Sequence, residues 1–200
     1  MKNTIKHYSE KAQHYYDLYH SVDAESVHSD WKAFLQNTKA GTALDVGAGS
    51  GRDANWLAEQ GWKVVAVEPA DNLRTLAQSN AHNSVTWCNA RLPELNALPH
   101  EPITYDLILL SAVWMHLSPD ERTESMQYIS SLLNTGGRLV ITLRHGAFND
   151  VRLTFPINVD EVYKLAQKYD LSVILVTDLA YDQLGRTEVS WQTLVLEKKR

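Results

Sequence analysis

Three glycines at two-residue spacing follow an acid in the pattern Asp45-x-Gly47-x-Gly49-x-Gly51. An apolar run precedes them and the amphipathic segment 53–60 follows, which predicts a strand, a tight loop and a helix. Glycines let a ligand approach the backbone without meeting a Cβ. The helix start beyond them offers free N–H groups to an anionic group. This stretch is therefore a candidate ligand site at the carboxyl end of the first strand of an α/β sheet.

Two common nucleotide-binding patterns fit this loop poorly. A dinucleotide fingerprint has the form G-x-G-x-x-G, but Arg52 stands at the third glycine position. A P-loop ends in Gly-Lys-Ser/Thr, and the loop has no lysine. A second signal comes from Glu68, which ends the β-branched run 62–67. In a nucleoside-binding α/β fold, an acid at this place accepts hydrogen bonds from ribose hydroxyls. Alternatively, Glu68 is an exposed charged residue at the end of the strand.

Candidate catalytic side chains follow later strands. His116 comes after the apolar strand 107–110 and has the ordinary pKa range of a general base. It is equally well explained as a helix-start histidine bonded to a carbonyl. Arg144 follows the strand 138–143, and Arg152 and Arg186 lie in predicted loops. Arginine forks bind carboxylate and phosphate, so we expect a small acceptor that is anionic or oxyanionic; each arginine alone can also be a surface charge.

An N-terminal helical cap is predicted from aromatic residues at three- and four-residue spacing over about residues 5–37. The cap packs on the sheet, or its aromatics close over the ligand, where a cation–π contact would suit a ligand with a cationic centre. Tyr15, Tyr16 and Tyr19 are the candidates. The sequence does not choose among them. We include Tyr16 in the set of predicted cofactor-binding residues as the aromatic contact.

Composition bounds the remaining possibilities. The 200 residues carry a net charge of −5 and a single cysteine, Cys88, which excludes an intrachain disulfide and a cysteine-based zinc cluster. The histidines lack the H-E-x-x-H spacing, and we expect no metal. No long basic run supports a general nucleic-acid surface, and we expect neither a signal peptide nor a membrane span. The expectation is a soluble cytoplasmic protein, as a monomer or homodimer.

Five features in order resemble the class I S-adenosylmethionine (SAM)-dependent methyltransferases. They are the glycine loop, Glu68, Asn89-Ala90, the strand Tyr-Asp-Leu-Ile-Leu-Leu at 105–110, and Leu-Leu-Asn-Thr-Gly-Gly-Arg-Leu at 132–139. The run 51–58 is also similar to tellurite- and thiopurine-type enzymes. The resemblance implies a Rossmann-like seven-stranded, mostly parallel sheet of order 3-2-1-4-5-7-6 with helices on both faces. We expect one domain over 1–200, with a cap at 1–38 and a core at 39–200.

The resemblance implies SAM as cofactor, S-adenosylhomocysteine (SAH) as product, and a set of binding residues. Where the family often has an Asp that holds the adenine amino group, this chain has Asn89, whose carbonyl can still accept a hydrogen bond. Ser111 and its neighbours would border the methyl group, and a salt bridge is an alternative role for Arg52. The predicted catalytic residues are His116 and Arg144, and the predicted cofactor-binding residues are Tyr16, Asp45, Gly47, Ala48, Gly49, Gly51, Arg52, Glu68, Pro69, Leu73, Asn89, Ala90, Arg91 and Ser111.

Other functions remain open from the sequence. A SAM-binding sensor or partner subunit would bind SAM without turnover, and a nicotinamide oxidoreductase is disfavoured by Arg52. A protein or RNA acceptor is a further alternative, although the acidic balance disfavours RNA. The motif Asn/Asp-Pro-Pro-Tyr/Phe of amino-methylating nucleic-acid enzymes is replaced by Ser111-Ala112-Val113-Trp114. Trp114 and Trp191 could instead form an aromatic acceptor pocket or belong to the core.

Overall fold

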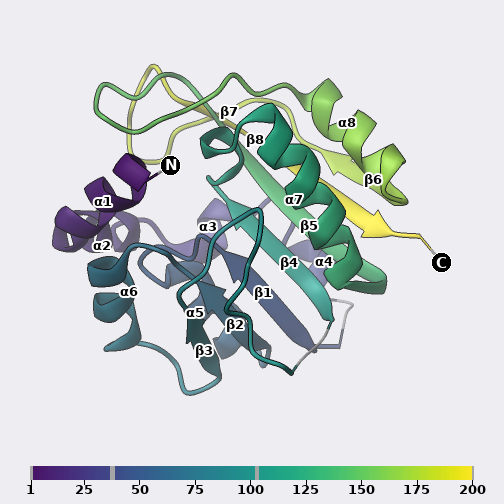
Figure 1. Cartoon of the computed structure of the whole chain (residues 1–200), viewed down its shortest axis with the longest axis horizontal. Coiled ribbons are helices and arrows are strands. Elements are labelled where there is room, and N and C mark those ends of the chain that lie inside the picture. The colour runs from purple at the N-terminus through teal and green to yellow at the C-terminus, as the bar shows by residue number, and fades with distance from the viewer. Residues whose placement is uncertain (1, 37–38, 102–103, 200) are drawn as a thin grey trace.

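The computed structural model describes residues 2–36, 39–101 and 104–199 and is built on an open sheet with helices on both faces (Figure 1). The main path of the sheet runs β3-β2-β1-β4-β5-β8-β6, and β7 pairs with β8 beside it. The strands are β1 (Thr42–Val46), β2 (Lys63–Val67), β3 (Val85–Cys88), β4 (Tyr105–Ser111), β5 (Leu133–His145), β6 (Leu171–Val176), β7 (Ala180–Tyr181) and β8 (Ser190–Lys198).

This topology confirms the predicted Rossmann-like sheet. Strands β1 to β5 pair in parallel, and β8 runs antiparallel to both β5 and β6. The predicted seventh strand is β8, and its number rises by one because the two-residue β7 precedes it. The carboxyl ends of the parallel strands therefore lie along one edge, where the sequence places its polar motifs.

Helices cover both faces of the sheet. In Figure 1, α7 and α8 lie in front of it, and α3, α4 and α5 lie behind it. The helical elements are α1 (Lys2–Glu10), α2 (Ala12–His20), α3 (Ala24–Val27), α4 (Ala33–Gln36), α5 (Arg52–Glu59), α6 (Asp71–Gln78), the 3-10 turn η1 (Trp114–His116), α7 (Pro119–Leu132) and α8 (Val159–Lys168).

The alternation of side chains along β4 divides the core into two layers. Ile108 and Leu110 join one buried cluster with Met126 of α7. Leu107 and Leu109 point to the other face and join a cluster that contains Trp31 and Leu57. Because both faces are covered, β4 reads as a continuous apolar run, as expected for a central parallel strand.

The N-terminal helices form a third cluster at one end of the sheet. Tyr15 of α2 is buried with Ala70 and Leu73, which lie at the start of α6, and Ile5 and Tyr8 of α1 pack against them. This arrangement places α1 and α2 beside the carboxyl edge of the sheet. The predicted boundary between cap and core, at 38 and 39, adjoins residues 37 and 38, which lie outside the described residues.

Helix α7 begins at a side-chain cap and ends where a strand begins. Ser118 accepts a hydrogen bond from the Glu121 amide, and Glu121 accepts one from the Ser118 amide, which completes a capping box. The helix ends at Leu132 without a glycine cap, because the chain turns directly into β5 at Leu133. A Cβ on Gly137 would lie 3.0 Å from the Tyr105 carbonyl oxygen. That glycine therefore permits close approach to β4 rather than ending the helix.

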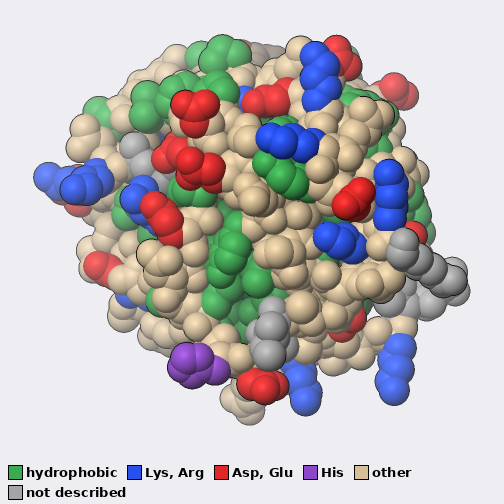
Figure 2. Space-filling view, turned by 45° about the vertical axis from the view of Figure 1, so that its right-hand side comes forward, with side chains coloured by type: hydrophobic (Ala, Val, Ile, Leu, Met, Phe, Trp, Pro, Cys, Tyr) green, Lys and Arg blue, Asp and Glu red, His purple; other side chains and the backbone are tan. Residues whose placement is uncertain are grey.

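The surface shows no segregation of charge on the face drawn in Figure 2, where Lys and Arg side chains are interspersed with Asp and Glu. Among residues 2–36, 39–101 and 104–199, no helix is long and apolar enough to cross a membrane. In the same part of the chain, no group of three or more His, Cys, Asp or Glu residues is arranged to hold a metal ion.

Candidate functional site

A cavity of about 350 Å³ opens at the carboxyl edge of the sheet, between the strand ends and the N-terminal helices. Its volume is within the range of small-molecule sites. We call one part of its wall the glycine-loop end, made by Gly47, Ala48, Gly49, Glu68, Pro69, Leu73, Ala90 and Arg91, and the other the arginine end, made by Tyr8, His116, Arg144, Phe148, Arg152, Asp182, Arg186 and Trp191.

The glycine loop takes backbone conformations that other residues rarely adopt. Gly47, Gly49 and Gly51 have φ values of 74°, 55° and 79°, all in the left-handed region. The Gly47 and Ala48 amides donate to the Val67 carbonyl at 2.8 and 2.9 Å, which ties the loop to the end of β2. A Cβ on Gly47 would lie 2.5 Å from Cγ2 of Val113. The loop is therefore held closely against its neighbours, and its shape depends on glycine.

Glu68 is buried at the end of β2 with its carboxylate on the cavity wall. Its two oxygens accept hydrogen bonds from the Gly49 amide at 2.9 Å and the Ala70 amide at 2.7 Å. Burial raises the pKa of Glu68 to about 7, although the two amides act in the opposite direction. The carboxylate retains lone pairs for further donors, and a donor that stabilises its charged form would lower this pKa.

A group of charged residues lies behind the glycine loop. Arg52 contacts Asp53 at 2.7 Å and donates to the Tyr19 carbonyl at 3.3 Å, and His28 Nε2 is 3.1 Å from Asp53 Oδ1. Burial alone would raise the pKa of Asp53, but the charges of Arg52 and His28 outweigh it and hold the pKa well below its ordinary range. This cluster fixes α2 and α3 to the start of α5.

Asp45 differs from its neighbours because one oxygen of its buried carboxyl has no hydrogen-bond partner among the described residues. It is 1% exposed, and among the described residues its Oδ2 accepts no hydrogen bond. Burial, followed by the nearby charge of Asp53, raises the pKa of Asp45 well above its ordinary value. Asp45 is not among the residues that line the cavity.

The structure brings most of the predicted site residues to this cavity. Its lining does not include Tyr16, Asp45, Gly51 or Asn89. The predicted residues that do line it are His116, Arg144, Gly47, Ala48, Gly49, Arg52, Glu68, Pro69, Leu73, Ala90, Arg91 and Ser111.

Local geometry explains why two polar candidates face elsewhere. Asn89 is exposed between buried Cys88 and Ala90, so the alternation of the strand end turns it outward, where it donates to Asp71 at 3.2 Å. Tyr16 packs on His20, with ring centroids 4.2 Å apart. Tyr19 lines the cavity instead, and its ring carbons would lie 3.7 Å from a Cβ on Gly49.

His116 has a defined tautomer at the arginine end. Its Nδ1 is 2.8 Å from the Leu153 carbonyl oxygen, which can only accept, so Nδ1 carries the hydrogen. Burial lowers the pKa of His116, and the charges of Arg152 and Arg144 lower it further. The neutral ring therefore leaves the Nε2 lone pair available, 3.5 Å from the Tyr8 hydroxyl. His116 thus bonds a carbonyl, as its structural interpretation expects, and it also lines the cavity; its role as a base stays a prediction.

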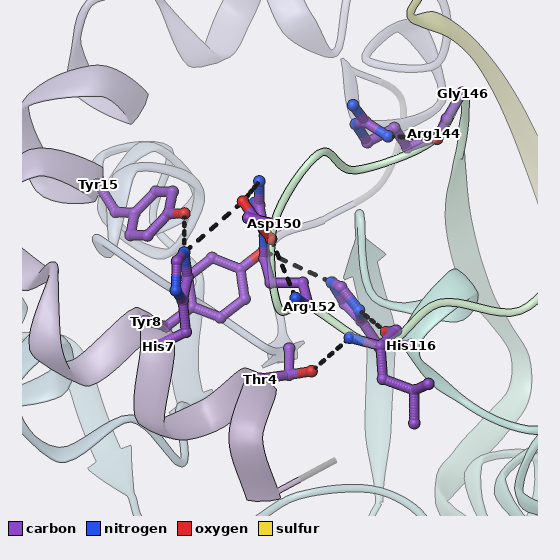
Figure 3. A network of polar contacts seen from close by, with 10 residues as sticks. Thr4, His7, Tyr8, Tyr15, His116, Arg144, Gly146, Asp150 and Arg152 are labelled. Carbon is purple, nitrogen blue, oxygen red and sulfur yellow. Dashed lines mark hydrogen bonds and ion pairs between the residues drawn. The ribbon is translucent and has the colours of Figure 1, made fainter.

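The N-terminal helix is joined to the 148–153 loop by a polar network (Figure 3). Arg152 donates to the Tyr8 hydroxyl at 3.2 Å and pairs with Asp150 at 2.7 Å. The Leu153 amide donates to Thr4 Oγ1 at 2.9 Å. Arg144 stands apart from this network in Figure 3, and its drawn bond goes to the Gly146 carbonyl. The arginine end is thus assembled from segments far apart in the sequence.

Sequence reasoning missed several of these wall residues. Phe148 was not singled out, yet the guanidinium carbons of Arg144 and Arg152 lie 3.8 and 3.9 Å from its ring centroid. Asp182 accepts from Arg186 and from Trp191 Nε1 at 2.6 and 2.7 Å. Phe148 lies in an irregular loop with no periodic pattern, whereas the four-residue spacing of Tyr15 and Tyr19 on one helix face was a usable signal.

Comparisons with known proteins agree with this geometry. A family model described as a methyltransferase domain matches residues 44–141. A methyltransferase of Alkaliphilus oremlandii, itself uncharacterized, is 28% identical over 113 residues, which are 54% of this chain and 47% of the relative. A second curated relative, from Staphylococcus carnosus, is 26% identical over 49% of its length. The chain therefore spans about half the length of these curated relatives.

Two solved structures share the fold over nearly the whole chain. The Burkholderia thailandensis 1,6-didemethyltoxoflavin-N1-methyltransferase, with bound 1,6-didemethyltoxoflavin and SAH, superposes with a TM-score of 0.72 at 20% identity, covering 98% of this chain and 87% of that one. A TehB-like SAM-dependent methyltransferase of Corynebacterium glutamicum gives 0.70 at 21% identity, covering 96% and 98%. At these identities the likeness establishes the fold.

Proposed function

The chain belongs to the class I SAM-dependent methyltransferase family, and on that premise we propose that it methylates a small-molecule acceptor. SAM is the cofactor, and it supplies an electrophilic methyl group on a sulfonium sulfur. The observation that carries the proposal is that one cavity contains both Glu68 with the glycine loop and a neutral His116 with an available lone pair. We propose a single methyltransferase domain for the whole chain.

The glycine-loop end fits the cofactor. The Glu68 carboxylate would accept hydrogen bonds from the ribose hydroxyls, which favour its charged form. Gly47 and Gly49 would let the methionine part approach the backbone without meeting a Cβ. Leu73 and Ala90 would give the adenine an apolar surface, since both are buried on the cavity wall. Tyr19, rather than Tyr16, is the aromatic residue beside Gly49 and so the better placed contact for a sulfonium.

The arginine end fits an acceptor. A methyl transfer requires the acceptor atom in line with the methyl carbon, so positioning supplies most of the rate. Where the acceptor atom arrives protonated, His116 Nε2 would take its proton. Arg144 would orient the acceptor, and its side chain lines the cavity beside Phe148. An anionic acceptor is supported by the three arginines on this wall, Arg144, Arg152 and Arg186.

A small acceptor is supported by the contacts that the N-terminal cap makes over the cavity. Residues of α1 and of the 148–153 loop line the arginine end. Gln183 also donates to the Ser26 carbonyl of the cap at 3.1 Å. A protein or RNA acceptor would have to displace these contacts. The charged side chains on the face in Figure 2 also form no basic patch of the kind that RNA binding uses.

The test is SAM turnover with pools of small acceptors. Wild type and Glu68→Ala are incubated with SAM, and SAH formation is followed by mass spectrometry. The proposal expects SAH formation that depends on one pool and is lost in Glu68→Ala. Tight SAM binding with no turnover across anionic, neutral and aromatic pools would favour a non-catalytic SAM sensor instead.

A further inference from the structure

We propose that the acceptor is a planar monoanion whose carboxylate pairs with Arg144, while its nucleophilic O–H or N–H lies near His116. This inference rests on the proposed function, because it specifies which small molecule the arginine end would hold. It follows from three observations. Arg144 has no carboxylate partner among the described residues, three other arginines on the cavity wall each pair with a carboxylate, and the Phe148 ring contacts both Arg144 and His116.

Arg144 is a buried cation without a counterion. Its side chain is 6% exposed, and no Asp or Glu among the described residues lies within ion-pair distance. Its Nη1 donates to the Gly146 carbonyl at 2.6 Å, whereas its Nε has no hydrogen-bond partner in that part of the chain. Burial, together with the charges of Arg186 and Arg152, lowers the pKa of Arg144. A buried, unpaired charge is unfavourable unless something pairs with it.

Three other arginines on the cavity wall each have their own carboxylate. Arg52 pairs with Asp53 at 2.7 Å, Arg152 with Asp150 at 2.7 Å, and Arg186 with Asp182 at 2.6 Å. These pairs neutralise their own cations, which leaves Arg144 as the source of one uncompensated positive charge at the arginine end. A ligand with one negative charge would balance it. The planar guanidinium of Arg144, which lines the cavity, matches the geometry of a carboxylate.

Phe148 connects this cation to the base. The Arg144 guanidinium carbon lies 3.8 Å from the Phe148 ring centroid, and the His116 ring stacks on Phe148 with centroids 5.6 Å apart and planes at 29°. Arg144 and His116 are therefore within the length of one small molecule. Tyr8 and Trp191 also line this end, and aromatic walls favour a flat ligand. A hydroxy- or aminoaryl carboxylate has both required groups.

The reaction balances with these residues. The acceptor oxygen or nitrogen forms a bond to the methyl carbon as the S–C bond breaks, and that bond's electron pair remains on sulfur. The acceptor proton passes to His116 Nε2, and solvent removes it when the products leave. The carboxylate at Arg144 is unchanged throughout, so it positions the acceptor and takes no part in bond formation.

The binding test uses hydroxy- and aminobenzoates and their uncharged amides, titrated by calorimetry with and without SAH. Wild type should bind at least one benzoate, and Arg144→Met should lose about 30-fold or more in its affinity. The matching amide should bind weakly and equally to both. Lys63→Gln removes one exposed charge at the far end of β2 and should bind benzoates like wild type. Inorganic sulfate in a parallel titration distinguishes an aryl carboxylate from any oxyanion.

A stability measurement separates this role from a structural one. Because Arg144 is an unpaired buried charge, Arg144→Met should unfold at the same temperature as wild type or at a higher one. The inference is overturned if no benzoate binds wild type, if benzoate and amide bind alike, or if Arg144→Met keeps wild-type affinity. Failure of SAH to bind would contradict the proposed function, and the titrations without SAH would still test Arg144.

Discussion

The two ends of the cavity are stabilised in opposite ways. At the glycine-loop end, the Glu68 oxygens already accept two backbone amides, and the loop amides already bind Val67. At the arginine end, Arg144 lacks a carboxylate among the described residues, and the His116 lone pair meets only the Tyr8 hydroxyl at 3.5 Å. At the glycine-loop end the loop amides and Glu68 already have backbone partners, whereas the arginine end contains a cation and a lone pair that a ligand would satisfy.

Cofactor binding and acceptor selectivity should therefore reside at different ends. The glycine-loop end is held by the paired strands β1 and β2, so its shape is set by the sheet. The arginine end is made by α1, η1 and loops, which vary most among proteins of one fold and carry their specificity. We expect substitutions at the two ends to change different measured quantities.

The largest expected effect is on the rate, from His116→Gln. Loss of the base should reduce kcat by about 10²- to 10⁴-fold for a protonated acceptor, with unchanged SAH affinity. His20→Gln is the matched control, because His20 also bonds a carbonyl, that of Tyr16 at 2.9 Å, but lies outside the cavity lining. In wild type, the acidic limb of the kcat profile should lie below the ordinary histidine pKa of 6.5. A kcat unchanged by His116→Gln would remove His116 from the chemistry.

Gly47→Ala should act on the other end. Its Cβ would meet Val113 in a left-handed backbone conformation, and a displaced loop should weaken SAH binding by about a hundredfold. Gly136→Ala is matched in strain, with φ of 77°, but a Cβ there meets nothing within 4 Å. Both variants should lose about 1–2 kcal/mol of stability from the backbone strain, whereas calorimetry should show weaker SAH binding only for Gly47→Ala. Equal SAH affinity in the two variants would contradict the importance of the loop.

The pH dependence of SAH binding should report Glu68. Its pKa of about 7 in the free protein means that ribose binding must expel a proton below that pH. SAH affinity should therefore fall by about tenfold per pH unit below pH 7 in wild type and remain flat in Glu68→Gln. A wild-type affinity that does not change between pH 5 and about 8 would place the ribose elsewhere.

The same group predicts a change in the stability of the free protein. The folded state binds the Glu68 proton more tightly than the unfolded chain, whose carboxyl keeps its ordinary pKa of 4.5. Stability contributed by this group is therefore lost as the pH rises from 4.5 to about 7. Glu68→Gln should not show this loss, so its unfolding temperature relative to wild type should rise across that interval in thermal scans.

The smallest effects are expected where the structure places predicted site residues outside the cavity. Asn89→Ala and Tyr16→Phe should change SAH affinity by less than about twofold, as surface substitutions generally do. Tyr19→Ala, which alters the cavity wall beside Gly49, should weaken SAH binding more than either. A larger loss in Tyr16→Phe than in Tyr19→Ala would show that the cap rearranges on binding.

The glycine-loop end was predictable because its signals are local. The pattern from Asp45 to Gly51 and the acid at Glu68 each follow a strand, and parallel strands bring their carboxyl ends to one edge. The predictions for Asn89 and Tyr16 differ from the structure in the direction of the side chain, which these local signals do not determine. Strand alternation around Cys88 and Ala90 turns Asn89 outward, and helical spacing places Tyr19, not Tyr16, on the face of buried Tyr15.

The arginine end was predicted only in part because its contacts are not local. The sequence gives no spacing between Tyr8 and Arg152, which bond across most of the chain. The pairing of Arg186 with Asp182 follows from a turn of five residues, but the lack of a partner for Arg144 depends on where every acid lies. No sequence pattern surrounds Phe148. Its contacts with both Arg144 and His116 could therefore be recognised only from the folded structure.

The most direct test of the central claim is a calorimetric titration of SAH into wild type and Glu68→Ala at pH 8, with thermal unfolding to show that both are folded. Wild type should bind SAH with micromolar affinity, and Glu68→Ala should lose that binding. Folded wild type that binds no SAH, or a variant that binds it equally well, would contradict the assignment of the glycine-loop end as the SAM site.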